Sequence, residues 1–182
     1  STSPWVPIYV VGFTVRESML LEFSPTIVCL ILAGKIGSNI ASEIGSMRIT
    51  EQIDALEIMG INSAGYLILP KIAAGMLIMP FLIAISMFLG IFGGYVMGTL
   101  SDACTSYQYI IGIQSFFDPT KLYYSFTKVF TFAFLITSIS SYFGYYTHGG
   151  ALEVGKSSTA AVVYSSILIL IFNYLITLLF YP

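Results

Sequence analysis

The chain has 182 residues, of which 57% are hydrophobic and only 9% are charged, with a net charge of −2. A soluble domain carries about 25% charged residues, so the composition excludes a soluble globular protein and indicates an integral membrane protein. The small net charge argues against a nucleic-acid partner, and Cys29 and Cys104 lack the spacing of a disulfide framework or a metal site.

The first apolar segment, residues 5–33, is interrupted by Arg16, Glu17 and Glu22. A bilayer span needs about 20 apolar residues, and residues 18–38 supply them if Glu22 faces protein or water. Two interpretations of these charges stay open. They are either functional groups inside the membrane, or paired side chains that snorkel to its interface.

A polar stretch, residues 34–70, follows this segment and holds four of the nine acidic residues. Within it, apolar or small residues recur at spacings of four, three and four, namely Ile49, Ile53, Leu56 and Gly60. This spacing predicts an amphipathic helix over residues 46–60. Ser46 or Thr50 is suited to cap its start, and Gly60 followed by Asn62 is suited to end it.

Three further spans are expected at residues 72–101, 129–146 and 159–180, which gives about four in all. Their connections are predicted as a loop over residues 102–120 and a second polar loop over residues 147–157. In the second span the glycines recur every fourth residue, at Gly90, Gly94 and Gly98. We expect this pattern to serve helix packing within one subunit rather than a dimer face.

Two lysines, Lys121 and Lys128, open the third span. Lys128 lies about two turns into the expected helix, where it either snorkels to the interface or faces a cavity. Snorkelling is the expectation that the residues alone favour.

Lysine and arginine residues concentrate in the polar stretch and in the second polar loop, which carries Lys156. With an even number of spans between them, these two segments lie on the same side of the membrane. The excess of positive charge predicts that this side is the cytoplasm.

The sequence offers little for catalysis on this chain. Around Gly34 the run AGKIGS departs from the phosphate-binding loop pattern, with Cys29 and Ile36 at positions that need Gly and Ser or Thr. His148 is the only histidine, and its glycine neighbours mark it as a loop residue. We therefore expect no catalytic residue, no metal site and no enzyme activity of the chain alone.

The run GKIGSNIASEIGSMRITEQIDALEIMG, followed by Pro70-Lys71 and later by GKSSTAAVVYSS, closely resembles the MlaE/YrbE permease family. These permeases are membrane subunits of ABC transporters that carry phospholipids and other lipids together with MCE proteins. The resemblance extends from about Glu22 to the end of the chain.

The resemblance implies an all-α integral membrane protein, a single permease domain over residues 1–182 that forms a homodimer in the inner membrane of a Gram-negative bacterium. Family members have five spans preceded by an interfacial helix, so we expect this chain to lack that helix and the first span. The implied partners are ABC ATPase subunits, which bind ATP and magnesium, a periplasmic MCE-domain protein and phospholipid; no cofactor is expected on this chain.

The resemblance also assigns roles to residues. Glu22 and Pro25 match the E-x-x-P stretch near the lipid cavity, and Lys128 is a further candidate for the lipid pathway. Residues 46–60 correspond to the coupling helix that docks into the ATPase, with Lys156 in the second cytoplasmic loop. Its candidate coupling residues are Arg48, Thr50, Glu51, Gln52, Asp54, Leu56 and Glu57.

Three departures from the family concern charge: Lys156 replaces a more frequent Arg, Asn173 replaces an acid in the last span, and residues 21–24 read Leu-Glu-Phe-Ser instead of Arg-Glu-Leu-Gly. From the residues alone, two other functions stay open. One is a secondary transporter or channel that uses Glu22 and Lys128 without an ATPase. The other is a scaffold whose polar helix lies on the membrane, against which its acidic face argues.

Overall fold

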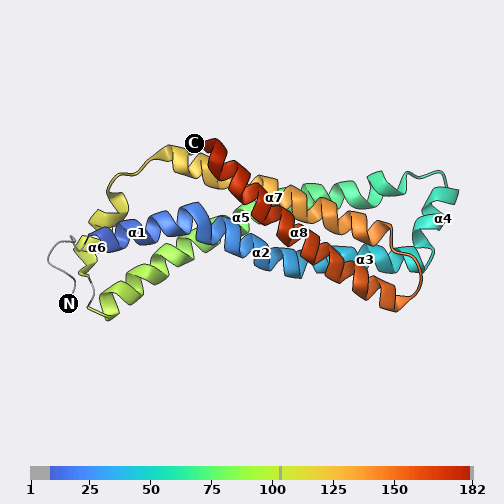
Figure 1. Cartoon of the computed structure of the whole chain (residues 1–182), viewed down its shortest axis with the longest axis horizontal. Coiled ribbons are helices and arrows are strands. Elements are labelled where there is room, and N and C mark those ends of the chain that lie inside the picture. The colour runs from blue at the N-terminus through green and yellow to red at the C-terminus, as the bar shows by residue number, and fades with distance from the viewer. Residues whose placement is uncertain (1–8, 103, 181–182) are drawn as a thin grey trace.

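The structure is a computed structural model that describes residues 9–102 and 104–180. Within these residues all regular structure is helical, and four helices are long and apolar enough to cross a membrane (Figure 1). The expected all-α membrane fold and the count of four spans are confirmed.

The first span belongs to one continuous helix of 40 residues, Val10–Ile49, here called the long helix. Its consecutive parts are α1 (Val10–Ser18), η1 (Met19–Val28), α2 (Cys29–Leu32), η2 (Ala33–Gly37) and α3 (Ser38–Ile49). In η1 and η2 the backbone follows wider π-type turns, and η1 contains Pro25, which has no amide hydrogen to donate. The helix thus extends well beyond the predicted residues 18–38 at both ends.

The predicted amphipathic helix is divided in the structure. Ile49 ends α3, Thr50 caps it, and Glu51 takes a left-handed conformation with φ of 61° before the short helix α4 (Gln52–Ile58). The prediction that Ser46 or Thr50 caps the start is wrong, because Ser46 lies inside α3 and the Thr50 hydroxyl donates back to the Ser46 carbonyl. Gly60, with φ of 76°, ends α4 as predicted.

Helix α5 (Ser63–Leu100) begins nine residues before the predicted span. The side chain of Asn62 accepts a hydrogen bond from the Gly65 amide, so Asn62 caps the start of α5 rather than ending α4. At about 1.5 Å per residue, the 38 residues of α5 extend about 57 Å, which exceeds the thickness of a bilayer core.

Residues 102–120, predicted as a loop, contain a further helix, α6 (Ser106–Gln114). A capping box starts it: the Thr105 side chain accepts from the Gln108 amide, and the Gln108 side chain accepts from the Thr105 amide. This Thr-x-x-Gln pattern was visible in the sequence and was missed.

The last two spans, α7 (Pro119–Tyr145) and α8 (Ala151–Phe180), also begin earlier than predicted. The side chain of Asp118 caps α7, with Pro119 in its first turn. Lys121 and Lys128 therefore lie within α7, and Lys156 lies in α8 rather than in a loop.

Helix α7 occupies the centre of the bundle and packs against α3, α5, η1 and α8. The main core gathers around it, with Val129, Phe132 and Ile136 fully buried. The two polar connections, α4 and the turn between α7 and α8, lie at the same end of the molecule, as predicted, while α6 lies at the opposite end (Figure 1). We refer to these as the α4 end and the α6 end.

The glycines of α5 pack within the chain, as expected. A Cβ on Gly90 would meet the Met19 side chain, and one on Gly94 would meet Val15 and the Tyr109 hydroxyl. These close approaches let α5 lie against the first part of the long helix.

Candidate functional site

A carboxylate and an ammonium group meet inside the bundle, where η1 passes α7. Lys128 Nζ lies 2.7 Å from Glu22 Oε1, and the Lys128 side chain is fully buried. Lys128 also donates to the Leu21 carbonyl at 3.3 Å, and its ammonium lies 4.3 Å from the centre of the Tyr124 ring. The expectation that Lys128 snorkels to the interface is therefore wrong, because its charge is neutralised inside the bundle.

The second carboxylate oxygen of Glu22 is held by α8 and by the next turn of η1. Asn173 Nδ2 donates to Glu22 Oε2 at 3.2 Å, and the Thr26 hydroxyl lies 2.9 Å from the same oxygen. From α7, the Tyr124 hydroxyl donates to Oε1 at 3.3 Å and shares a 2.8 Å hydrogen bond with Thr177. Glu22 is thus the acceptor at which three helices meet, and we call this cluster the Glu22 centre.

The two charges of the Glu22 centre differ in access. The Glu22 side chain is 46% exposed, whereas the Lys128 side chain is 0% exposed. A cationic group outside the bundle can therefore approach the carboxylate, while an anionic group reaches Lys128 only by displacing Glu22. The centre can bind a zwitterion through its carboxylate, or exchange its internal ion pair for one with a ligand.

Pro25 is buried one turn from this carboxylate, inside the wide turns of η1. It removes a backbone donor there, and π-type turns occur often at functional sites. Pro25 follows Glu22 by three residues, as in the E-x-x-P pattern.

Asn173 occupies the position where the family resemblance implies an acid. Its amide donates to Glu22, which a carboxylate would not do at neutral pH. The site therefore holds one negative and one positive charge. Thr26, Tyr124 and Thr177 were not predicted, because their hydroxyls carry no signal in the sequence beyond that of ordinary helix residues.

The other charges of the first segment form a separate cluster at the α6 end. Arg16 is 3% exposed, pairs with Glu17 at 2.6 Å, and donates to the carbonyls of Ile113 and Ser115 at the end of α6. Lys121 Nζ lies 2.5 Å from the other oxygen of Glu17. Arg16 thus binds the negative end of the α6 dipole. Of the two interpretations, pairing holds for Arg16 and Glu17, but Arg16 is buried against α6 rather than extended to an interface.

At the α4 end, the coupling residues divide between internal bonds and open surface. Arg48 pairs with Asp54 at 2.8 Å, and Glu57 accepts from Ser63 at 2.8 Å and from Tyr145 at 2.9 Å. These bonds fix α4 against α3, α5 and α7. The hydrogen bonds from Ser63 and Tyr145 lower the pKa of Glu57.

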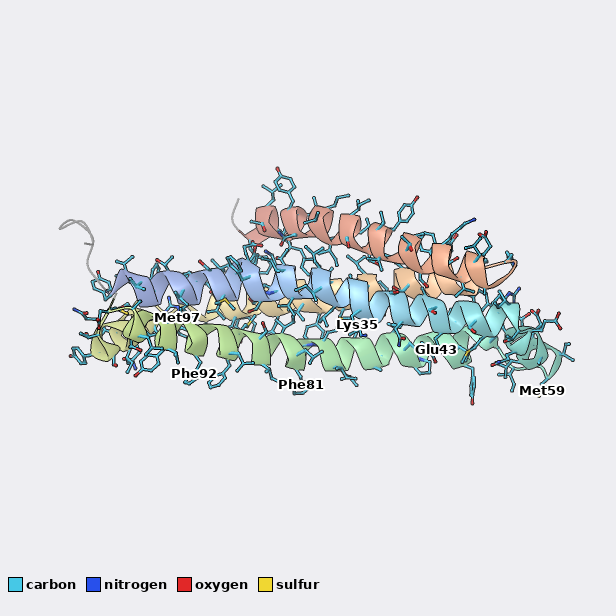
Figure 2. All side chains as sticks on the ribbon, turned by 90° about the horizontal axis from the view of Figure 1, so that it is seen from below. Lys35, Glu43, Met59, Phe81, Phe92 and Met97 are labelled. Atoms are coloured by element: carbon cyan, nitrogen blue, oxygen red, sulfur yellow. The ribbon has the colours of Figure 1, made fainter. Side chains whose placement is uncertain are left out.

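The sequence predicts that Ile49, Ile53, Leu56 and Gly60 form one apolar stripe. In the structure these residues do not form a single exposed surface. Ile53 is fully buried in a small core with Ile40 and Ile44, and Leu56 is half-buried. Ile58 and Met59 are instead 87% and 65% exposed at the tip of the helix. Met59 lies at the far end of the molecule (Figure 2) and follows Ile58 in the chain, so the two side chains offer an apolar contact. The polar coupling residues Thr50, Glu51 and Gln52 are also exposed, at the other end of α4.

Lys156 lies apart from these sites, on the open surface of α8, where it pairs with Glu153 at 2.6 Å.

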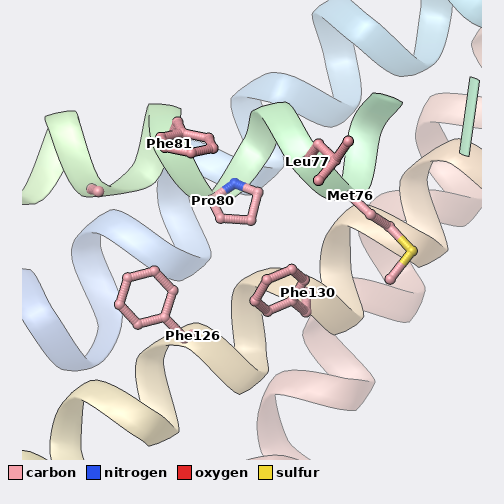
Figure 3. Close-up of a pocket in the computed structure, with 7 residues that line it drawn as sticks. Met76, Leu77, Pro80, Phe81, Phe126 and Phe130 are labelled. Atoms are coloured by element: carbon pink, nitrogen blue, oxygen red, sulfur yellow. The ribbon is translucent and has the colours of Figure 1, made fainter. Parts of the chain in front are cut away.

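A recess with a volume of about 260 Å³ lies between α5 and α7. It is lined by Met76, Leu77, Pro80, Phe81, Ala84, Phe126 and Phe130 (Figure 3). Since this lining contains no charged side chain, the recess fits hydrocarbon and not a polar headgroup. Among the described residues no group of three or more His, Cys, Asp or Glu side chains could hold a metal ion.

Comparison with known proteins gives a family and several relatives. The model of the family described as Permease MlaE matches residues 3–179. A probable ABC transporter permease protein of Rickettsia bellii is 43% identical over 164 residues, which cover 90% of this chain and 63% of that protein. The chain thus spans a little under two thirds of the length of this relative.

Two more distant relatives extend the comparison. A probable ABC transporter permease protein of Synechocystis is 33% identical over 94% of this chain and 65% of its own length. The chloroplastic protein trigalactosyldiacylglycerol 1 of Arabidopsis thaliana is 34% identical over 94% of this chain and 49% of its own length.

Proposed function

The chain belongs to the MlaE permease family, and from this premise we propose that it is the membrane subunit of an ATP-driven transporter of phospholipid. Two copies of the permease, in the inner membrane of a Gram-negative bacterium, would pass lipid to or from a periplasmic MCE-domain protein. ATP and magnesium would bind to separate ATPase subunits. The Arabidopsis relative carries the name of a glycolipid, which agrees with a lipid as cargo.

The observation that carries this proposal is the Glu22 centre. An ion pair inside a membrane protein is costly, and it persists where a substrate uses it. Phospholipid headgroups carry a phosphate, and the common zwitterionic ones add an ammonium group. The half-exposed carboxylate of Glu22 can bind that ammonium group, and Lys128 can then bind the phosphate. The apolar recess between α5 and α7 offers a surface for acyl chains.

The link to an ATPase is proposed at the tip of α4. Ile58 and Met59 form an exposed apolar pair, and the exposed polar residues Glu57 and Asn62 flank it in the chain. An apolar anchor inside a polar rim is the usual arrangement of a helix that docks into a groove on its partner. Because Arg48, Asp54 and Glu57 fix α4 to the bundle, a push on its tip would be transmitted to the spans.

The test uses the full-length permease, extracted gently with the proteins bound to it. Native mass spectrometry is expected to show two permeases, two ATPase subunits and bound phospholipid. A permease with neither ATPase nor lipid, under conditions that preserve comparable complexes, would contradict the proposal and favour a channel or secondary transporter.

Transport is then measured as ATP-dependent transfer of a labelled phospholipid from vesicles that contain the complex. Glu22→Gln is expected to reduce transfer strongly. Glu153→Gln is the matched control, because Glu153 also pairs with a lysine but on the exposed surface of α8. Equal transfer by both variants and the wild type would remove the Glu22 centre from the mechanism.

A further inference from the structure

A stripe of exposed residues follows the long helix at every fourth position, and its chemistry changes midway. The first three members are apolar, Phe23, Ile27 and Ile31. The next three are Lys35, Asn39 and Glu43, which are polar and equally open. The position of Lys35 at this change, with Glu43 further along the helix, is seen in Figure 2.

Contacts of two glycines give the depth of Lys35 in the bundle. Gly37 lies against the Ser140 side chain of α7, and Gly75 of α5 lies against Thr137 of the same helix. Lys35 is two residues from Gly37. It therefore lies near the level of Thr137 on α7 and of Gly75 on α5.

At this level the outward faces of the neighbouring helices are apolar. Leu77 and Ile78 of α5 are 67% and 55% exposed, and Phe134 of α7 is 49% exposed. Such side chains face the hydrocarbon of a bilayer. At its own level Lys35 is thus surrounded by surfaces that suit hydrocarbon, where a lysine is not expected to face lipid.

Lys35 has no internal ion pair to neutralise it in the described part of the chain, unlike Lys128. It is connected instead to the α4 end by its polar neighbours on the stripe. Asn39 follows one turn on, and Glu43 one turn further pairs with Lys71 of α5 at 2.6 Å. The Glu43 side chain is 45% exposed and that of Lys71 is 22% exposed, so water can reach this pair from outside the bundle.

We propose that Lys35, Asn39 and Glu43 line a hydrated lane through the half of the membrane nearer the α4 end, along which a phospholipid headgroup moves to or from the Glu22 centre. Lys35 binds the phosphate of the headgroup, and the Glu43–Lys71 pair forms the mouth of the lane. This inference rests on the proposed transport of phospholipid and adds a second binding site for the headgroup, besides the Glu22 centre.

Two features of the structure support a lane over a dry protein contact. Lys35 lies in the wide turns of η2, as Glu22 lies in those of η1, and turns of this type occur often at functional sites. Two copies in one membrane are related by an axis along the membrane normal, so a dimer contact through the stripe would place Lys35 beside its own copy. Two ammonium groups repel each other strongly in a dry interface.

Water in the lane is tested by cysteine modification of the full-length permease with its ATPase in lipid nanodiscs. The reagent is a charged methanethiosulfonate that does not enter hydrocarbon. The native Cys29 and Cys104 are buried. Lys35→Cys and Asn39→Cys are expected to react about tenfold faster than Ile78→Cys and Phe134→Cys, the matched controls at exposed apolar positions of α5 and α7.

Protection of all four cysteines, together with oxidative cross-linking of Lys35→Cys between two permeases, would overturn the lane and identify a dimer contact. Short-chain phospholipid is expected to slow the modification of Lys35→Cys, whereas inorganic phosphate at the same concentration is not. Equal slowing by both would identify a general anion site and not a headgroup site.

The role of Lys35 in transport is tested in the same complex with labelled phosphatidylethanolamine. Lys35→Gln is expected to lower ATP-dependent transfer about tenfold, and Lys35→Arg to restore most of it. Glu153→Gln, which removes an exposed charge on α8, serves as the control. If the wild type is active and Lys35→Gln transfers lipid equally well, the lane is refuted but the proposed transport is not. If the wild type itself shows no transfer, the proposed transport is refuted.

Discussion

Removing either member of the Glu22 centre leaves the other charge without its partner, but the two losses are not equal. Glu22→Gln leaves the Lys128 ammonium fully buried without a counterion, and an uncompensated buried charge costs about 3–5 kcal/mol. Lys128→Met leaves the Glu22 carboxylate half-exposed and still bonded to Thr26 and Asn173. That loss is about 1.5–3 kcal/mol, the range for a lost hydrogen bond to a charged group.

The double variant Glu22→Gln/Lys128→Met removes both charges and keeps the side-chain volumes similar. It is expected to be more stable than Glu22→Gln alone, with a coupling energy of about 2–3 kcal/mol. Its transport activity is nevertheless expected to be lost, because neither charge of the Glu22 centre remains to bind the headgroup. The double variant should therefore regain stability relative to Glu22→Gln without regaining transport.

The free energy of unfolding is measured by reversible denaturation in mixed detergent–lipid micelles, for the wild type, both single variants and the double variant. Glu153→Gln on α8 is the control for loss of an exposed ion pair, expected to change the free energy by less than about 1 kcal/mol. Equal losses of stability in the two single variants would refute the asymmetry derived from their burial. Losses that simply add in the double variant would refute the coupling between the two charges.

Three other variants test the two ends of the molecule. Ile58→Asp is expected to abolish co-purification of the ATPase while membrane insertion and folding are kept, since Ile58 is 87% exposed; unchanged co-purification would contradict docking at this tip. Arg16→Leu removes the cation that binds the end of α6, and a loss of about 2–4 kcal/mol in the free energy of unfolding is expected because Glu17 loses a partner as well; no loss would show that α6 is held by its packing alone. Tyr145→Phe removes a hydrogen bond that keeps the pKa of Glu57 below its usual 4.5. The variant should therefore be less stable than the wild type above that pH, and this difference should disappear as the pH falls through the lowered pKa. An equal difference in melting temperature between variant and wild type at about pH 6 and at about pH 3 would contradict this sign.

The spans could be predicted from the sequence because a bilayer imposes a simple rule on composition and length. Their ends could not. The long helix and α5 continue for many residues past the apolar stretches, since polar residues there bond to other helices: Arg16 to α6, Arg48 to α4 and Ser63 to α4 and α7. Helix α6 was predicted as part of a loop because it has only nine residues. The capping box formed by Thr105 and Gln108 was the signal in the sequence that marks its start.

The site was predicted in part. An acid three residues before a proline inside a span marked Glu22, since a charge at that depth needs a reason. Lys128 was read as a snorkelling residue because a single sequence does not show that Glu22 and Lys128, 106 residues apart, share an ion pair. The hydroxyl and amide groups from α7 and α8 could not be assigned either, because their role depends on the packing of helices that are distant in sequence.

The long helix connects all the sites described above, and this is the main physical consequence of the fold. At one end Arg48 ties it to α4, in the middle Glu22 ties it to α7 and α8, and at the other end Arg16 ties it to α6. A straight α-helix would transmit a displacement of α4 along its axis to all three ties with little change. The wide turns of η1 and η2 interrupt the regular hydrogen-bond pattern between these ties, so they are the places where the helix can shift its register at low cost. Since Lys35 and Glu22 lie in those two segments, a displacement of the α4 end would move these two side chains first, before it reached the α6 end.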